Sequence, residues 1–455
     1  MVVLHNIQQR YAWPLIGIAL VLIQCAPLAI KIIGVGILCV VALSHSTLLL
    51  VATIATTPLY LIPVALTATA AIPLHEIVWG VAVTSWGIMR WRQRQPIVTW
   101  TRQDGWVGAL VVGASITVLW ALPEGRGEAL RWLRWLIVEP VVWYLCVRTA
   151  LRSQHLQMHH LVHGMLLSAG IVAAIGILQA LGIDIVPWLG AKRAFSDNVV
   201  STGNIVRVAS VYGHPNNFGL FLERIWPFAL ISVLVPQWRT RFTSTILILC
   251  AIGLLLSFSR GAWLASGLAT VLLGLWFFGA SLIRRRPWVL VSVIALGIVG
   301  VIITLLTRGT SAGSLDARVL LWRESLTWLQ ARPWGLGLGQ FYFYHNPEYG
   351  HSIIDASLVG TSEQYAAHPH NFILDVWLNL GPWGVVVVGA LLWQAWRKSL
   401  MVSQGAWLAV AAGVMLIAAS VHGFVDQFLF VSDIAFCFWW ALCVIDVDTA
   451  PSTRL

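Results

Sequence analysis

The sequence contains very little charge. Asp, Glu, Lys and Arg together make up 10% of the 455 residues, whereas 58% are hydrophobic. A soluble globular protein carries about 25% charged and ~45–50% apolar residues. This shortage of charge excludes a conventional soluble enzyme. The apolar residues form long runs, and because about 20 of them cross a ~30 Å hydrocarbon core, they predict a polytopic membrane protein.

Lysine is also scarce, and the cysteines follow no recognised pattern. Only three of the 28 cationic residues are lysines, so the net charge of +10 comes mainly from arginine. A basic balance often indicates nucleic-acid binding, but short Arg clusters between apolar runs are typical of the cytoplasmic ends of membrane spans. We therefore predict no nucleic-acid partner. The six cysteines lie inside apolar runs without CxxC or metal-ligand spacing, so we expect buried packing residues.

The apolar runs predict an all-α fold of about 12–14 transmembrane helices in a lipid bilayer. Their approximate ranges are 13–30, 32–66 (one or two spans), 67–89, 105–122, 132–150, 161–183, 217–236, 243–258, 262–281, 287–306, 371–395, 405–424 and 429–446. Arginine-rich clusters all fall on one side of this arrangement, which is therefore cytoplasmic: 90–102, 148–152, 239–241, 284–286 and 397–398. We divide the chain into N-terminal spans, 1–190, and a second part, 191–455.

Polar segments on the opposite, external side are 184–216, 259–261, 307–370 and 422–427. The third is the longest, and long loops are usually functional. Within it, Asp316–Ala331 has apolar residues at helical spacing, which predicts an amphipathic helix against the membrane surface. Pro333 ends that helix. The alternating glycines that follow (Gly335, Gly337 and Gly339) predict a flexible turn rather than a phosphate-binding loop, because no βαβ unit surrounds them.

The long segment ends with His368-Pro369-His370-Asn371, directly before a helix that we expect to begin at Phe372. A helix N-terminus favours an anionic ligand. A histidine at this position, with an ordinary pKa of about 6.5, suits the work of a general base. The alternative is a surface histidine that only caps the helix.

Arginines gather on the same external side. Arg260 interrupts two apolar runs, and Arg207 precedes the polar segment Tyr212–Asn217. Arg318 and Arg323 lie on the predicted surface helix. Taken singly, each could be a solvated or snorkelling arginine. Further polar residues on this side or inside the spans are Glu223, Arg224, His422, Asp426 and Gln427.

Several arginines near a histidine suit a phosphate or pyrophosphate ligand. The histidine could take a proton from an attacking hydroxyl while arginine stabilises a pyrophosphate leaving group. The external segments contain no Asp/Glu cluster with Mg²⁺-like spacing, so we predict neither a metal nor a cofactor. Because the external space has no nucleotide pool, we expect a pre-activated donor, such as a lipid-linked glycan pyrophosphate.

A family resemblance rests on the following segments, in chain order: RVASVYGHPNNFG, SFSRGAWLA, DARVLLWRESLTWLQARPWGLGLGQF, HPHNFILDVWLNLGPWG and HGFVDQ. Their order around one long external loop resembles the O-antigen ligase/polymerase family of bacterial membrane glycosyltransferases. The resemblance implies a GT-C-like fold in the bacterial inner membrane with a periplasmic active site. It also implies metal-independent transfer of a glycan from undecaprenyl pyrophosphate, either to lipid A-core (ligase branch) or to another glycan (polymerase branch).

The resemblance implies roles for individual residues as well. The loop-exit histidine of the family corresponds to His370, the expected base. Two family arginines correspond to Arg260 and Arg318, which would hold the pyrophosphate. His368 is an internal rival for His370. The other expected substrate-binding residues are Arg207, His214, Asn216, Arg323, His368, Asn371 and His422.

Other functions remain open at this point. The same motifs fit a polysaccharide polymerase or a protein O-oligosaccharyltransferase. A lipid-linked glycan flippase would bind the pyrophosphate without breaking a bond, but it needs cations along its spans, whereas here they gather at one face beside a histidine. A structural or sensor protein would leave the polar residues of 307–370 and 422–427 unexplained.

Overall fold

The structure is a computed structural model that describes residues 2–67, 70–190, 199–202, 205–285, 312–401 and 405–449. Its helices are α1 (Val2–Cys25), α2 (Leu28–Thr56), α3 (Leu74–Arg92), α4 (Asp104–Thr117), α5 (Arg126–Trp132), α6 (Glu139–Arg152), α7 (Met158–Ala180), α9 (Pro215–Leu234), α10 (Arg241–Ser257), α11 (Arg260–Arg285), α13 (Ala312–Ala331), α14 (Phe341–His345), α15 (Phe372–Leu400), α16 (Trp407–Gly423) and α17 (Ser432–Asp448). The strands form two antiparallel hairpins, β1 (Pro63–Ala65) with β2 (Ala71–Pro73) and β3 (Val199–Thr202) with β4 (Ile205–Val208).

Long apolar helices dominate the fold. Those long and apolar enough to cross a membrane are Leu28–Leu61, Met158–Ala180, Pro215–Leu234, Arg260–Gly279 and Phe372–Leu400. Shorter apolar helices are Tyr11–Cys25, Asp104–Trp120, Arg241–Ser257 and Trp407–Gly423. The predicted all-α polytopic membrane fold is confirmed. The predicted span 287–306 lies outside the described residues, and the total of 12–14 spans stays a prediction.

The region from 57 to 73 differs from the prediction. Its described residues, 57–67 and 70–73, contain no span: α2 ends at Thr56, a 3-10 turn follows at Thr57–Leu61, and the β1–β2 hairpin pairs Pro63 with Pro73. Proline lacks the N–H that a continuing helix needs, which explains why the apolar run 32–66 stops being helical before its end. The next helix, α3, begins at Leu74.

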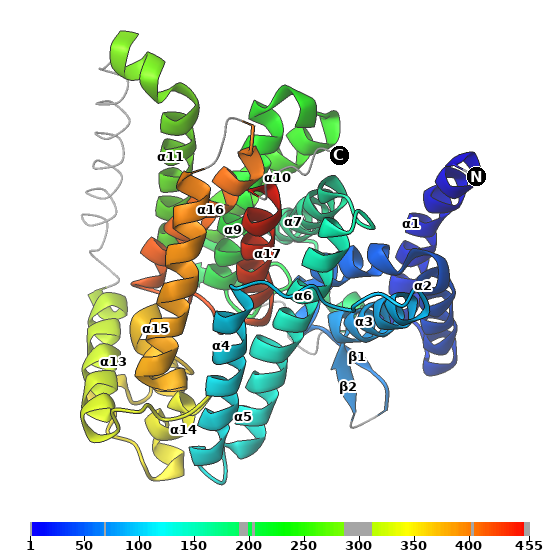
Figure 1. Ribbon diagram of the computed structural model, residues 1–455. Helices are drawn as coiled ribbons and strands as arrows, with labels where there is room; N and C mark the ends of the chain where they lie inside the picture. The colour runs from blue at the N-terminus through cyan, green and yellow to red at the C-terminus, as the bar shows by residue number, and fades with distance from the viewer. Residues whose placement is uncertain are drawn as a thin grey trace.

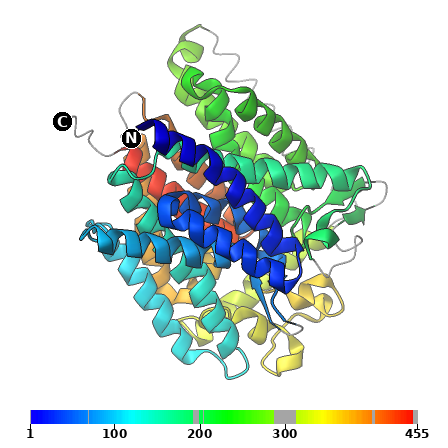
Figure 2. The same cartoon turned by 90° about the vertical axis from the view of Figure 1, so that its right-hand side faces the viewer.

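The helices form one bundle around a shared apolar core (Figure 1). Figure 2 shows α1, α2 and α3 side by side on one flank. The core includes residues from both predicted parts of the chain, 1–190 and 191–455, so these pack as one body. We call the end that carries the α10–α11 turn and residues 312–371 the loop face, and the other end the opposite face.

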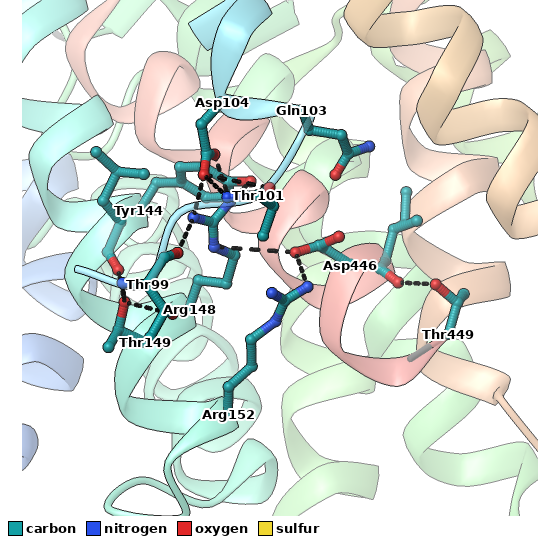
Figure 3. Close-up of polar contacts among 12 residues, drawn as sticks. Thr99, Thr101, Gln103, Asp104, Tyr144, Arg148, Thr149, Arg152, Asp446 and Thr449 are labelled. Atoms are coloured by element: carbon teal, nitrogen blue, oxygen red, sulfur yellow. Dashed lines mark hydrogen bonds and ion pairs between the residues drawn. The ribbon is translucent and has the colours of Figure 1, made fainter. Parts of the chain in front are cut away.

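A buried charged cluster joins helices at the opposite face (Figure 3). The Arg148 side chain, which is 0% exposed, forms a bidentate pair with Asp104, with nitrogen–oxygen distances of 2.6 and 2.8 Å. Asp446 lies 3.9 Å from Nε of Arg148 and binds Arg152 and Lys398, each at 2.7 Å. Because an unpaired buried charge is costly, the cluster fixes how α4, α6, α15 and α17 pack together.

The segment after α13 is closely packed, which corrects the expectation of a flexible turn. Its glycines all have positive φ angles: Gly335 (+88°), Gly337 (+105°) and Gly339 (+68°). A Cβ at Gly335 would lie 2.6 Å from the Trp377 carbonyl oxygen, so backbone contact with α15 needs glycine there. The glycines of this segment therefore serve close contact with neighbouring segments.

Hydrogen bonds hold this segment in place. The buried Gln340 side chain accepts a hydrogen bond from the Leu122 N–H and donates one to the Gly125 carbonyl, both at 3.0 Å. The Gly339 N–H donates to Oδ1 of Asn379 at 2.7 Å. The loop is thereby tied to the α4–α5 connection on one side and to α15 on the other (Figure 1).

The cysteines follow the prediction only in part. Cys146, Cys250, Cys437 and Cys443 are buried, as expected. Cys25 and Cys39 are exposed, because they lie on the faces of α1 and α2 that point away from the bundle.

Candidate functional site

His370 lies between two carboxylates at the loop face. Its Nδ1 is 3.4 Å from Oδ1 of Asp426, in the α16–α17 connection, and its Nε2 is 3.6 Å from Oε2 of Glu363. The backbone at His370 is left-handed, with φ of +51°. Such a backbone is strained for a non-glycine residue and is frequent at functional sites. The side chain remains 19% exposed, so one part of the ring is open to a ligand.

The two carboxylates determine the charge of His370. Burial alone would lower its pKa, but the contacts with Asp426 and Glu363 outweigh burial and raise the pKa to about 9. Burial would raise the pKa of Asp426, yet His370, His422 and Arg318 together hold it well below its usual range. The pair is therefore an imidazolium beside a carboxylate at neutral pH.

Arg318 completes this group. This residue lies on α13. Its Nη2 is 3.8 Å from Oδ2 of Asp426, and its side chain is 21% exposed. Asp426 thus contacts both the predicted base and one of the predicted pyrophosphate-binding arginines. The fold brings these residues together from three segments that lie more than 50 residues apart in the chain.

His368 has a different setting from His370. Its Nδ1 accepts a hydrogen bond from the His370 N–H at 3.3 Å, and its Nε2 contacts the Gln427 side-chain amide. Burial, followed by the charge of His370, lowers the pKa of His368 well below its ordinary value. Both ring nitrogens of His368 have hydrogen-bond partners, whereas those of His370 lie 3.4 and 3.6 Å from carboxylate oxygens and its side chain is partly exposed. This geometry favours His370 over His368 as the group that meets a ligand.

Arg207 and Arg260 are neighbours on the same face. Nε of Arg207 donates to the Ser257 carbonyl at 3.1 Å, and its Nη2 donates to Oδ1 of Asn216 at 2.7 Å. Burial and then the charge of Arg260 lower the pKa of Arg207. Arg260, the first residue of α11, is exposed. Two arginines close enough to repel each other favour an anion between them.

His214 is the N-cap of α9, and its Nδ1 accepts from the Asn216 N–H at 3.1 Å. Partial burial and the charge of Arg207 lower its pKa, while Asp426 opposes this change. His214 and Asn216 therefore lie next to both the arginine pair and the His370 group. A neutral histidine here offers a sugar hydroxyl a hydrogen-bond partner.

His422, in the last turn of α16, lies between the start of α11 and Asp426. Its Nδ1 lies 2.7 Å from Oε2 of Glu223, and its Nε2 lies 3.9 Å from Oδ2 of Asp426. A Cβ at Gly261 would overlap the His422 ring, so the start of α11 packs directly on this imidazole. Both contacts make His422 a support between Arg260 and Asp426, and its predicted contact with substrate stays a prediction.

Two of the predicted substrate-binding residues, Asn371 and Arg323, lie in positions that favour other roles. Oδ1 of Asn371 accepts from the Ile373 and Leu374 N–H groups at 3.1 Å, so the residue caps α15. Arg323 is exposed and lies five residues after Arg318 on α13, about 140° around the helix at ~100° per residue. Arg323 therefore points away from the Arg318 side of α13.

Sequence reasoning missed Glu363 and undervalued Asp426. A lone acidic residue in a polar loop carries no pattern, so nothing in the sequence distinguishes Glu363. Asp426 had a weak signal, because it lies four residues after His422 between two apolar runs. Its contacts with His370, Arg318 and His422 could be found only from the folded chain.

One group in the described part of the chain could hold a metal ion: His75, Glu76 and Glu139. It lies on α3 and at the start of α6, away from the segments that carry His370. Arg134 pairs with both carboxylates, at 2.6 and 3.6 Å. The neighbouring cation makes metal binding there less favourable, and the prediction of a metal-independent site is left as a prediction.

Part of the chain matches a known protein family. Residues 245–389 match the family described as O-antigen ligase. The matched region begins in α10, contains Arg260, Arg318 and His370, and ends in α15. No curated protein matches the chain. The match and the helical membrane fold support a membrane glycosyltransferase of the O-antigen ligase/polymerase type. The resemblance carried by the motifs is confirmed for this region, which is similar to the O-antigen ligase family.

Proposed function

We propose that the protein transfers a glycan from undecaprenyl pyrophosphate to an acceptor hydroxyl, which in the ligase branch belongs to lipid A-core. The site would face the periplasm from the bacterial inner membrane. The observation that carries the proposal is the grouping of His370, Asp426 and Arg318 beside Arg260 and Arg207 on one face. A flippase would need its cations along a path through the bundle instead.

The arginines would act on the leaving group. Arg260 and Arg207 would bind the pyrophosphate through parallel N–H donors, which match its oxygens better than an ammonium does. Arg318, on α13 with its Nη2 3.8 Å from Oδ2 of Asp426, would add a third positive charge. Positive charge placed where the pyrophosphate develops negative charge lowers the barrier to C–O cleavage. The proposed step uses no metal.

His370 would act on the acceptor. The acceptor oxygen forms a bond to the anomeric carbon while the bond from that carbon to the pyrophosphate oxygen breaks. The hydroxyl proton moves to Nε2 of a neutral His370, and undecaprenyl pyrophosphate leaves with the electron pair. Asp426 would hold the ring through Nδ1, as a carboxylate holds the histidine of other general bases.

A transfer assay tests this proposal. Purified protein would be mixed with an undecaprenyl-pyrophosphate glycan in EDTA, with lipid A-core or without added acceptor. We expect lipid A-core product from the wild type and a loss of at least about 100-fold in His370→Ala, the usual size of a general-base contribution. Arg260→Lys and Arg318→Lys should recover little activity, because the bidentate contact is lost.

The controls separate the alternatives. Arg323→Ala is the matched control, because it removes an arginine from the same helix but from another face. Glycan chains that lengthen without added acceptor would identify a polymerase. Donor binding with no bond change in the wild type would favour a flippase. Full activity of both His370→Ala and Arg318→Ala would contradict the assignment of the site.

A further inference from the structure

An apolar groove lies on the outside of the bundle, between α4, the end of α13 and the point at Gly381 where the helical backbone of α15 is interrupted. Its volume is about 740 Å³, within the ~300–1,000 Å³ usual for small-molecule sites. Val112 and Ile116 on α4 and Trp383 on α15 line it, and all three are about half exposed. α4 is one of the shorter apolar helices of the bundle, so in a bilayer this exposed apolar surface would contact lipid.

One charged side chain lines the groove. Arg332 directly follows the last residue of α13, is exposed, and lies 5.2 Å from the centre of the Tyr344 ring. No ion pair of Arg332 occurs among the described residues. Trp120 and Trp334 also line the groove, and such residues favour the membrane–water boundary. An apolar groove with a cation at its polar end complements a lipid that carries a phosphate.

The groove is well separated from His370. Arg318 lies next to Asp426, and α13 runs from there to Ala331, 13 residues later. At 1.5 Å per residue this distance is about 20 Å. The phosphate of the proposed donor is bonded to the transferred sugar carbon, so a donor reacting at His370 cannot place that phosphate at Arg332. An acceptor with several sugar rings between its lipid phosphate and its reactive hydroxyl can span this distance.

We propose that this groove binds the acyl chains of the acceptor, a phosphorylated glycolipid whose oligosaccharide reaches along α13 to His370. Arg332 would bind the lipid phosphate, and Val112 and Ile116 would contact the chains. The inference rests on the proposed function and narrows it to the ligase branch. It also explains why one cation is placed at an apolar groove apart from the other arginines.

Photo-crosslinking tests binding without turnover. A photoactivatable residue at position 116 would be illuminated in nanodiscs that contain phospholipid, the acceptor glycolipid and undecaprenyl pyrophosphate at equal amounts. We expect selective labelling of the glycolipid. The same residue at position 248, on the lipid-exposed surface of α10, is the control and should label lipids in proportion to their abundance. Selective labelling of undecaprenyl pyrophosphate, or equal labelling of all lipids, would overturn the proposal.

Kinetics provide the second measurement. Ile116→Trp fills the groove, and Ile248→Trp is its matched control. We expect Ile116→Trp to raise KM for the acylated acceptor about tenfold, a modest loss of binding energy. KM for the donor, and transfer to the same oligosaccharide released from its lipid, should not change. Arg332→Gln should act similarly on the phosphorylated acceptor, whereas Arg126→Gln, an exposed arginine outside the groove, should not.

The outcomes also distinguish the inference from the proposed function. If the wild type transfers no glycan but position 116 selectively labels the glycolipid, the groove assignment stands and the proposed reaction fails. If transfer proceeds and Ile116→Trp raises the KM of the donor instead, the groove holds the polyprenyl chain. If transfer proceeds and neither KM changes, the groove holds bulk lipid only.

Discussion

At the scale of single residues, the position of Glu363 depends on a buried partner, His345, that the sequence does not reveal. The Nε2 of His345 lies 2.7 Å from the Glu363 carbonyl oxygen, and its Nδ1 lies 2.8 Å from Oε2 of Glu324. The His345 side chain is 0% exposed. Glu363 in turn holds one side of the His370 ring, so a residue far from any ligand positions the predicted base.

The raised pKa of His370 predicts the pH dependence of transfer. If only the neutral ring accepts the proton, about one molecule in a hundred is active at pH 7 with a pKa of about 9. We expect kcat/KM to rise about tenfold per pH unit from pH 7 and to level off near pH 9. Asp426→Asn should move this rise to lower pH, because it removes a charge that raises the pKa.

A pH profile of initial rates at subsaturating donor checks this expectation. His345→Gln is an informative companion, because it disturbs the Glu363 backbone without removing a carboxylate from the site. A rate that falls above pH 9 would contradict the role of His370 as a base. That result would indicate an imidazolium that stabilises the pyrophosphate instead.

At the scale of elements, contact between the segment after α13 and the kink in α15 sets the shape of the loop face. α15 is interrupted at Gly381, which has φ of +72° and is followed by Pro382. The carbonyl of Leu378 accepts from the N–H groups of Leu336 and Gly337. The helix α13, which carries Arg318, is thereby anchored at its C-terminal end, while Arg318 itself reaches Asp426.

Glycine-to-alanine substitutions test this contact. Gly335→Ala and Gly381→Ala should each destabilise the protein by more than the ~1–2 kcal/mol that a left-handed backbone costs an L-residue. A Cβ at these positions would lie 2.6 and 2.7 Å from the carbonyl oxygens of Trp377 and Trp334. Transfer activity should fall as well, because Arg318 loses its support.

Gly350 is the matched control. Its left-handed backbone (φ +73°, ψ 6°) carries the ~1–2 kcal/mol cost by itself, because nothing lies within 4 Å of a Cβ there. Thermal unfolding in detergent and limited proteolysis of residues 332–371 measure the difference. Equal effects of all three substitutions would show that backbone strain, and not contact with α15, explains the loss.

At the scale of the whole molecule, the sequence predicts helices and one reactive face but not the packing that joins them. Apolar runs reveal the helices because lipid requires them. His370, Arg260 and Arg318 are recognisable because polar residues are rare in this sequence. The remaining features depend on contacts between distant segments, such as the hydrogen bond from Gln340 to Gly125. These features are the position of Glu363, the hydrogen bonds of Gln340 and the packing of the glycine segment. Local patterns contain no information on such contacts.

The charged cluster at the opposite face is the clearest whole-molecule feature, and it predicts a large loss of stability. Asp104→Asn removes the bidentate partner of Arg148, which is 0% exposed. Breaking a buried ion pair from one side costs about 3–5 kcal/mol. We expect thermal unfolding at markedly lower temperature, with α4 separating from α6 and α17. The double variant Asp104→Leu with Arg148→Met should be more stable than Asp104→Asn, because no charge is left unpaired.

The exposed pair Arg131–Glu128 is the control, since its side chains are 51% and 25% exposed. Glu128→Gln should cost at most about 1 kcal/mol, as surface pairs do. Unfolding curves of the three variants in one detergent would measure these differences, with donor binding as a second readout of the loop face. If Asp104→Asn were no less stable than Glu128→Gln, the remaining carboxylate, Asp446, would be enough to neutralise Arg148, and the opposite face would not fix the order of the helices.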